Sequence, residues 1–170
     1  MKETDLILDM SSLGGYKLLK SYETEAQILS AAYKKSEKYW RSVYKWLTLP
    51  LIVTSTLMSI FSTIELNKYV LMGISFTSFL LSGFNQAINP NEKTNRANQV
   101  STEFGEIHST IRQFIGENSK TKDQIKIFSQ NQLSMLDVWK SLSPPISSKY
   151  MEEARIQYTV RPTRMDESNR

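Results

Sequence analysis

Two long runs of uncharged, mainly apolar residues in the middle of the chain constrain its fold more than any other feature. The first extends from Leu47 to Ile64 and the second from Tyr69 to Ile88. As helices these runs would be about 27–30 Å long, close to the hydrocarbon thickness of a bilayer. Helices that are apolar all round would need a larger soluble core than the polar remainder can build. We therefore predict an all-α fold with a membrane-spanning hairpin over residues 47–88.

The connection between the two runs, residues 65–68, has only four residues. It suits a tight turn between antiparallel helices and leaves no room for a domain on the far side. Basic residues flank the hairpin on its other side: Lys34, Lys35, Lys38, Arg41 and Lys45 precede it, and Lys93 and Arg96 follow it. Such residues favour the cytoplasmic side, so we expect an integral, multi-pass protein with both termini cytoplasmic. A bacterial inner membrane, a host membrane and the inner membrane of a virion all fit this pattern.

Aromatic residues cluster where the first run begins. Trp40, Tyr44 and Trp46 are candidate membrane-interface anchors, because amphipathic rings favour the headgroup region.

Small and hydroxylated residues recur at intervals of four within both runs. The candidates are Ser55, Ser59, Gly73, Thr77, Ser78 and Ser82. Such residues let helices approach closely in lipid, and packing is the favoured interpretation. Lining of a water-filled pore in an oligomer is the alternative, although no charged residue inside the runs marks an ion pathway.

Helices are also predicted on either side of the hairpin. Residues 16–46 form an amphipathic juxtamembrane helix, and residues 91–142 form a cytoplasmic helical region. Its first part carries a packing seam with coiled-coil spacing: Ala97, Val100, Phe104, Ile107, Ile111 and Phe114. A second stripe comprises Ile125, Phe128, Met135, Trp139 and Leu142. These surfaces would pack on one another or on neighbouring copies of the chain.

The two ends of the chain are predicted to be irregular. Gly14 and Gly15 indicate a flexible break that sets off residues 1–15 as a separate N-terminal segment. Pro144 and Pro145 should stop the preceding helix, leaving residues 143–170 as an extended or mobile tail.

Composition argues against several other functions. The chain has no cysteine, and its single histidine, His108, has no histidine partner for a metal site. No phosphate-binding glycine loop or catalytic triad is present, so we expect no enzymatic activity and no cofactor. The net charge of +4 is spread through both flanks without a basic run, so no nucleic acid partner is expected. The first fifteen residues do not resemble a signal peptide.

The arrangement resembles the SLATT superfamily of two-span membrane proteins and similar short membrane proteins of large DNA viruses. The resemblance covers residues 33–115: the segment YKKSEKYWRSVYKWLTLP, the Ser/Thr-rich first run, the exit NPNEK and the segment FGEIHSTIRQFI. The match lies in the order of these segments and in the kinds of residue that they contain. It implies a homo-oligomeric, pore-forming effector of the kind associated with bacterial nucleotide-signalling defence. A viral relative would instead imply a structural role in a virion or host-derived membrane.

Three functional hypotheses follow. The first is a non-enzymatic double-pass membrane protein that oligomerises through its hairpin and cytoplasmic helices and could form a pore. The second is an anchoring protein that links a bilayer to a protein assembly such as a viral capsid. The third and weakest is an accessory subunit of a membrane enzyme complex.

Overall fold

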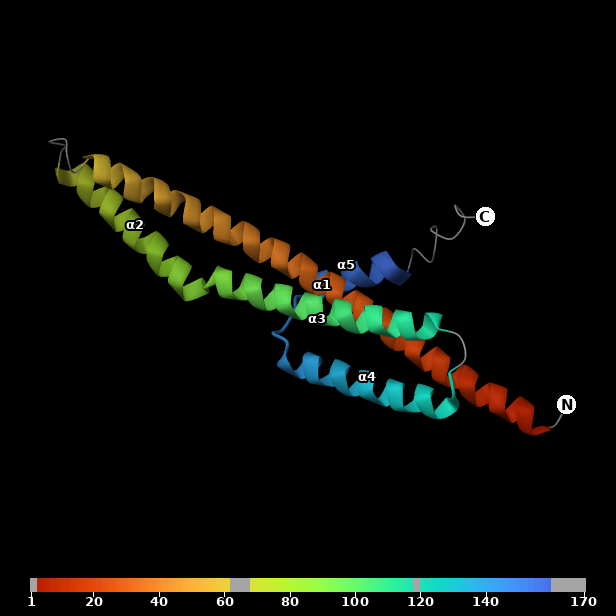
Figure 1. Ribbon diagram of the computed structural model, residues 1–170. Coiled ribbons are helices and arrows are strands. Elements are labelled where there is room, and N and C mark those ends of the chain that lie inside the picture. The colour runs from red at the N-terminus through yellow and green to blue at the C-terminus, as the bar shows by residue number, and fades with distance from the viewer. Residues whose placement is uncertain (1–2, 62–67, 118–119, 160–170) are drawn as a thin grey trace. The chain divides into compact units, whose positions relative to one another are not determined.

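A computed structural model describes residues 3–61, 68–117 and 120–159, with side chains from residue 14 to residue 158 of those ranges. These residues form five α-helices and no strand (Figure 1). The helices are α1 (Glu3–Phe61), α2 (Lys68–Ile88), α3 (Pro90–Gly116), α4 (Lys122–Leu142) and α5 (Ser148–Thr159). The chain divides into two compact units, a hairpin of residues 37–96 and a bundle built from residues 1–36 and 97–170.

The predicted break at Gly14 and Gly15 is wrong, because α1 continues through both residues. Glycine weakens a helix by about 1 kcal/mol relative to alanine, so packing has to compensate. Gly15 lies so close to α4 that an added Cβ would stand 2.9 Å from Ile125 Cγ2, whereas Gly14 has open space around it. Gly15 is therefore a close-approach position in the bundle.

The end of α2 is marked by a change in backbone conformation at one residue. Asn89 has a φ of 44°, in the left-handed region that asparagine tolerates better than most residues. Pro90 follows as the first residue of α3, where a missing N–H is harmless. The Asn89 side chain donates to Glu92 Oε2 at 2.6 Å, so the break is also held by a local hydrogen bond.

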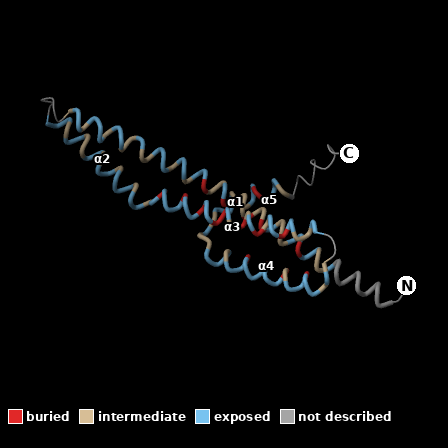
Figure 2. Tube along the Cα trace, in the orientation of Figure 1, coloured by how far each residue is buried: buried red, intermediate tan, exposed pale blue. Residues whose placement is uncertain are grey.

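The bundle has a conventional apolar core made by α1, α3 and α4, visible as the buried positions of these helices in Figure 2. The core residues are Leu19, Ala26, Leu29, Tyr33, Val100, Phe104, Ile107, Ile111, Ile125 and Leu136. Helix α4 begins with a capping box, in which Thr121 Oγ1 accepts from the Gln124 N–H and the Gln124 side chain accepts from the Thr121 N–H.

The stripe expected on α4 is only partly correct. Ile125 is buried and Phe128 and Trp139 pack against the core, but Met135 and Leu142 are exposed. The buried positions are Ile125, Ser129, Gln132 and Leu136, which repeat at 4-3-4. Gln132 thus occupies a core position, and the predicted stripe strays from the buried face at Met135.

The extended tail expected from residue 143 is also wrong over residues 148–159, which form α5. Ala154 is buried and Met151, three residues earlier on the same face, packs against the core. These contacts and the ion pair between Lys35 Nζ and Glu153 Oε2, at 3.1 Å, join this short helix to the bundle. The remainder of the predicted tail, from residue 160, lies outside the described residues.

Candidate membrane hairpin

The hairpin consists of the second half of α1 and the whole of α2, which run antiparallel (Figure 1). Ser75 Oγ of α2 donates to Met58 Sδ of α1 at 3.5 Å, which fixes one point of contact. Half-buried residues repeat every three or four positions on both helices and mark the facing sides. They include Leu47, Leu51, Thr54, Met58 and Phe61 on α1, and Leu71, Ser75, Ser78, Leu81 and Asn85 on α2.

The outward faces of both helices are apolar and exposed. Exposed large side chains on α1 are Trp46, Leu49, Ile52, Val53, Leu57 and Ile60; those on α2 are Tyr69, Val70, Met72, Phe76, Phe79, Leu80 and Phe84. Helix α2 has no buried residue, and Figure 2 shows the hairpin without a buried position in either apolar run. Folded soluble proteins rarely expose contiguous apolar patches of more than a few hundred Å².

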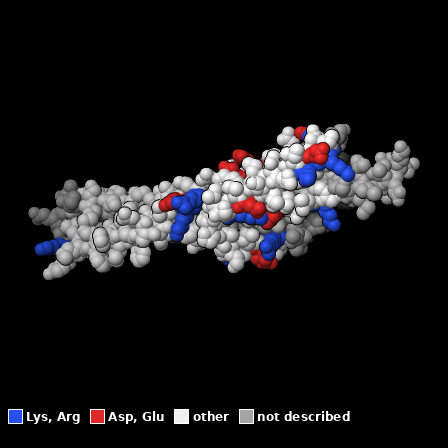
Figure 3. All heavy atoms as spheres, turned by 90° about the horizontal axis from the view of Figure 1, so that it is seen from below, with Lys and Arg blue, Asp and Glu red and all other residues white. Residues whose placement is uncertain are grey.

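Both helices are therefore long and apolar enough to cross a membrane. A buried core helix of a soluble protein would pass the same test of length and composition. Here, however, none of either apolar window is buried by the protein itself. In the view of Figure 3, no charged side chain is visible along the hairpin between a mixed group of charges at one end and a single basic side chain at the other.

Of the six predicted packing or pore-lining residues, only Ser78 lies on the side of its helix that faces the other one. Ser55, Ser59, Gly73, Thr77 and Ser82 are exposed, and Ser78 is half-buried. Ser55 Oγ donates to the Leu51 carbonyl at 2.8 Å, and Thr77 Oγ1 donates to the Gly73 carbonyl at 2.9 Å. Such back-bonding satisfies a hydroxyl without water or a second helix.

Two other small residues of the hairpin were not among the predicted packing residues. Gly83 and Ala87 are exposed and four residues apart on α2, and a Cβ added at Gly83 would meet nothing within 4 Å. Their spacing is the same signal that singled out Gly73 and Thr77, so the sequence contained it. Ser75, which contacts Met58, was not among the predicted residues because no small residue lies four positions before or after it.

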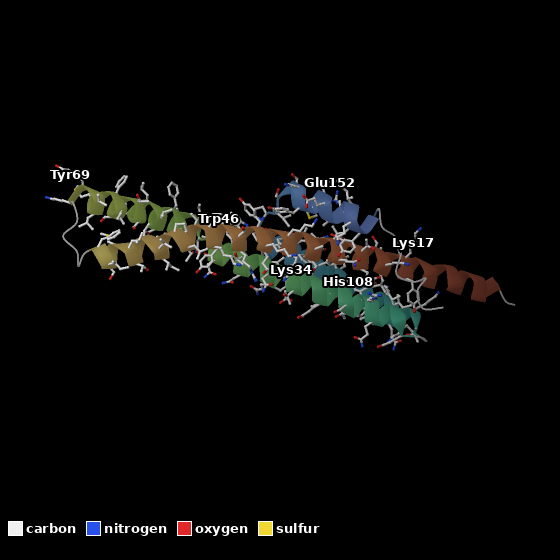
Figure 4. The ribbon with its side chains drawn as sticks, turned by 90° about the horizontal axis from the view of Figure 1, so that it is seen from above. Lys17, Lys34, Trp46, Tyr69, His108 and Glu152 are labelled. Carbon is white, nitrogen blue, oxygen red and sulfur yellow. The ribbon has the colours of Figure 1, made fainter. Side chains whose placement is uncertain are left out.

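The three predicted interface anchors differ in their surroundings. Trp46 is 77% exposed (Figure 4) and Tyr44 is exposed as well. Trp40 is half-buried: Lys93 Nζ lies 4.4 Å from its ring centroid, and Tyr39 packs edge-on at 5.2 Å. Trp40 therefore joins α1 to α3 within the hairpin unit, while Trp46 and Tyr44 remain available to a bilayer interface.

The predicted cytoplasmic seam is buried within the chain. Ala97, Val100, Phe104, Ile107 and Ile111 are all buried, and Phe114 is half-buried and stacked on Phe128 at 3.8 Å between ring centroids. Tyr33 of α1 stacks on Phe104 at 5.9 Å. Of the two partners that the sequence left open, these residues use other helices of the same chain.

A close contact between α1 and α3 accompanies this seam. Ser30 Oγ donates to the Ser101 carbonyl at 2.8 Å, and Ser101 Oγ donates to the Ser30 carbonyl at 3.0 Å. Gly105, four residues after Ser101, also faces Ser30: a Cβ added there would stand 3.5 Å from Ser30 Oγ, an ordinary van der Waals distance. The sequence signal for this contact is the Ser101–Gly105 spacing, which the prediction of the apolar seam did not use.

The bundle offers little material for chemistry. His108 Nε2 lies 3.6 Å from Glu23 Oε1, with both side chains largely covered (His108 is labelled in Figure 4). Within the described ranges, no three His, Asp or Glu side chains converge as a metal site would require. Comparisons with protein-family models, curated proteins and solved structures found no match to this chain.

Proposed function

We propose that this chain is a non-enzymatic, double-pass membrane protein that self-associates through the outer face of its hairpin. In this proposal α1 and α2 cross the bilayer and both termini lie in the cytoplasm. The basic flanks support that orientation, because Lys and Arg favour the cytoplasmic side.

The observation that carries the proposal is the pairing of the chain before the first span with the chain after the second. The reciprocal Ser30–Ser101 hydrogen bonds and the Tyr33–Phe104 stack join segments separated by 71 residues. Segments that pack together must lie on the same side of any membrane that the intervening hairpin crosses. Two spans satisfy this requirement and a single span does not.

Self-association is assigned to the hairpin because the cytoplasmic seam is already occupied. Gly73 and Gly83 present open backbone on the outer surface of α2. In lipid, helices associate through small residues that permit close backbone approach, and hydroxyl groups add hydrogen bonds between helices.

Pore formation is the extension of this proposal that the SLATT resemblance supports. The outer hydroxyls of Ser55 and Thr77 already bond to their own helix, so they do not require a water-filled channel. We therefore place self-association first and conduction second.

Topology is tested by single cysteines, which are unique labels because the chain has none of its own. An impermeant maleimide added to intact cells should label Asn67→Cys, in the predicted connection between the spans, and not Gln99→Cys, which is exposed on α3. Permeabilised cells should label both. Labelling of Gln99→Cys alone in intact cells would reverse the orientation, and equal labelling of both would contradict the hairpin.

Self-association is tested by filling the open backbone positions. In detergent or nanodiscs, Gly73→Leu and Gly83→Leu should shift the oligomer toward monomer by light scattering. Met72→Leu, on the same helix, is the matched control and should not. A monomeric wild-type protein would contradict the proposal, and stable oligomers without current in planar bilayers would exclude the pore.

A second candidate, anchoring of a bilayer to a protein assembly such as a viral capsid, is favoured by the outer surface of α4. Ile127, Met135, Val138 and Leu142 are exposed there, between 49 and 69%. Stoichiometric recovery of the chain with capsid proteins from purified virions, lost in Val138→Asp, would support this role. Recovery that ignores the substitution would count against α4 as the contact.

A further inference from the structure

The outer face of α1 carries basic side chains directly before its exposed apolar side chains, in one helical register. Lys38, Arg41 and Lys45 repeat at 3-4, and all three are exposed. Leu49 and Ile52 continue the same spacing and are exposed as well. At 3.6 residues per turn these five residues share one side of the helix, so cations lead without interruption into an apolar surface.

We call the three cations of this face the basic stripe (Lys38, Arg41 and Lys45). They differ in their contacts with neighbouring residues. Arg41 is oriented by Glu37, whose Oε1 lies 2.6 Å from the guanidinium and whose side chain is almost fully buried. Lys38 and Lys45 have no ion-pair partner in the part of the chain that the structure describes, and both side chains are exposed. One carboxylate among three cations leaves this face with a net positive charge.

Cations elsewhere in the same unit are engaged differently. Lys93 lies over the Trp40 ring, and Arg96 pairs with Glu92 at 2.7 Å on α3. Neither is followed by exposed apolar residues in its own helical register: the apolar residues after Lys93, Ala97 and Val100, are buried, and Arg96 is followed by the polar Gln99. Among the described residues of this unit, Lys68 of α2 also precedes exposed apolar residues, Met72 and Phe79, but it is a single cation; only α1 has three cations leading into such a surface.

We propose that the basic stripe and the apolar residues after it form a binding site for an acidic glycerophospholipid. The phosphate group lies against Lys38, Arg41 and Lys45, and an acyl chain runs along Leu49 and Ile52. Guanidinium and ammonium groups bind phosphate oxygens through charge-assisted hydrogen bonds. A nucleic acid would use the cations but would gain nothing from the apolar half. This site rests on the proposed membrane insertion of the hairpin.

The test measures lipid retention by the full-length protein. Native mass spectrometry from detergent, with phosphatidylglycerol or phosphatidylcholine added in equal amounts, should show preferential binding of phosphatidylglycerol. Each cation near an anionic lipid contributes about 1 kcal/mol, a factor of about five in affinity. Lys38→Gln/Lys45→Gln should therefore weaken phosphatidylglycerol binding by at least about tenfold and leave phosphatidylcholine binding unchanged.

Two matched variants separate a site from a general charge effect. Lys126→Gln/Lys149→Gln removes the same charge from exposed positions on α4 and α5 and should retain the preference. Lys38→Arg/Lys45→Arg preserves the charge and should also retain it. An equal loss in the α4–α5 variant, or no loss in the basic-stripe variant, would overturn the proposal. Equal competition by soluble glycerol phosphate would show that the apolar half contributes nothing and would overturn the lipid assignment.

A control distinguishes failure of the lipid-site proposal from failure of the proposed membrane insertion. Wild-type protein should resist extraction from membranes by alkaline carbonate. If it is extracted, membrane insertion fails and the lipid site fails with it. If it resists extraction but binds both lipids equally, only the lipid site is rejected.

Discussion

The hairpin and the bundle use similar residues in opposite ways. In the bundle, large apolar side chains such as Phe104 point inward, and the hydroxyls of Ser30 and Ser101 bond from one helix to the other. In the hairpin, large apolar side chains such as Phe79 point outward, and the hydroxyls of Ser55 and Thr77 bond back to their own helix. Composition alone therefore does not separate a core from a surface that suits lipid.

Helix α1 contains this contrast within a single element. Leu19, Ala26, Leu29 and Tyr33 are buried in its first half, whereas Leu49, Ile52 and Val53 are exposed in its second half. Burial of the first half follows from a soluble-type core, since apolar area leaves water by packing on other helices. The exposed second half would be stabilised by an apolar solvent such as the interior of a bilayer, or by apolar contacts with another protein.

The largest expected difference between the regions comes from a matched pair of phenylalanines. Phe104→Ala should destabilise the bundle by about 3–5 kcal/mol, because it leaves a cavity in a closed core. Phe76→Ala, on the outer face of α2, should change the unfolding free energy by less than about 0.5 kcal/mol. Chemical denaturation in detergent, followed by circular dichroism, measures both. Equal losses would mean that Phe76 is covered by other protein.

An introduced charge should have a larger effect in the hairpin than in the bundle. Phe79→Arg places a cation near the middle of the second apolar run and should disfavour insertion by about 2.5–3.5 kcal/mol. Ile127→Arg, at an exposed position of α4, should leave insertion unchanged. Carbonate extraction and a membrane-insertion assay report the difference. Full insertion of Phe79→Arg would indicate that this face does not meet lipid.

Removal of single hydroxyl groups should give a smaller difference in stability between the bundle and the hairpin. Ser101→Ala should destabilise the bundle by about 1 kcal/mol, since it removes a buried hydrogen bond between α1 and α3. Ser55→Ala should have almost no effect, because its bond stays within one helix turn. A double-mutant cycle of Ser30→Ala with Ser101→Ala should reveal coupling. Strictly additive effects would argue that the two bonds act independently.

The smallest effect is a pH dependence confined to the bundle. Burial raises the pKa of Tyr33, while a hydrogen bond with Ser143 opposes the rise. Because the folded-state pKa lies above the unfolded value of about 10, this contribution to stability is complete below pH 10 and declines as pH rises further. Tyr33→Phe should flatten that decline in the unfolding free energy. An unchanged decline in Tyr33→Phe would assign it to another group.

The helical class and the two long apolar helices followed from the sequence because both depend on local patterns. Charge-free runs and periodic apolar residues are visible without tertiary information. Helix α2 likewise ends at Ile88, the last residue of the second apolar run.

The errors have a common physical origin in tertiary packing. Gly15 looked like part of a flexible pair, but the neighbouring Ile125 explains its lack of a side chain. Helix α5 looked like an extended tail, since the packing of Met151 on the core and the ion pair of Glu153 with Lys35 are tertiary contacts. The outward direction of Ser55 and Thr77 likewise depends on which stripe the partner helix covers, and local spacing does not specify that.

The contact between Ser30 and Ser101 also sets an order for biosynthesis. A ribosome releases the first half of the bundle long before the second, and the whole hairpin is made in between. In the proposed membrane topology, the early segment stays unpaired until both spans have been inserted and the chain has returned to the side where it began. A chain inserted with only one span would leave the two halves of the bundle in different compartments. In that topology, assembly of the bundle would therefore report that both spans are in place.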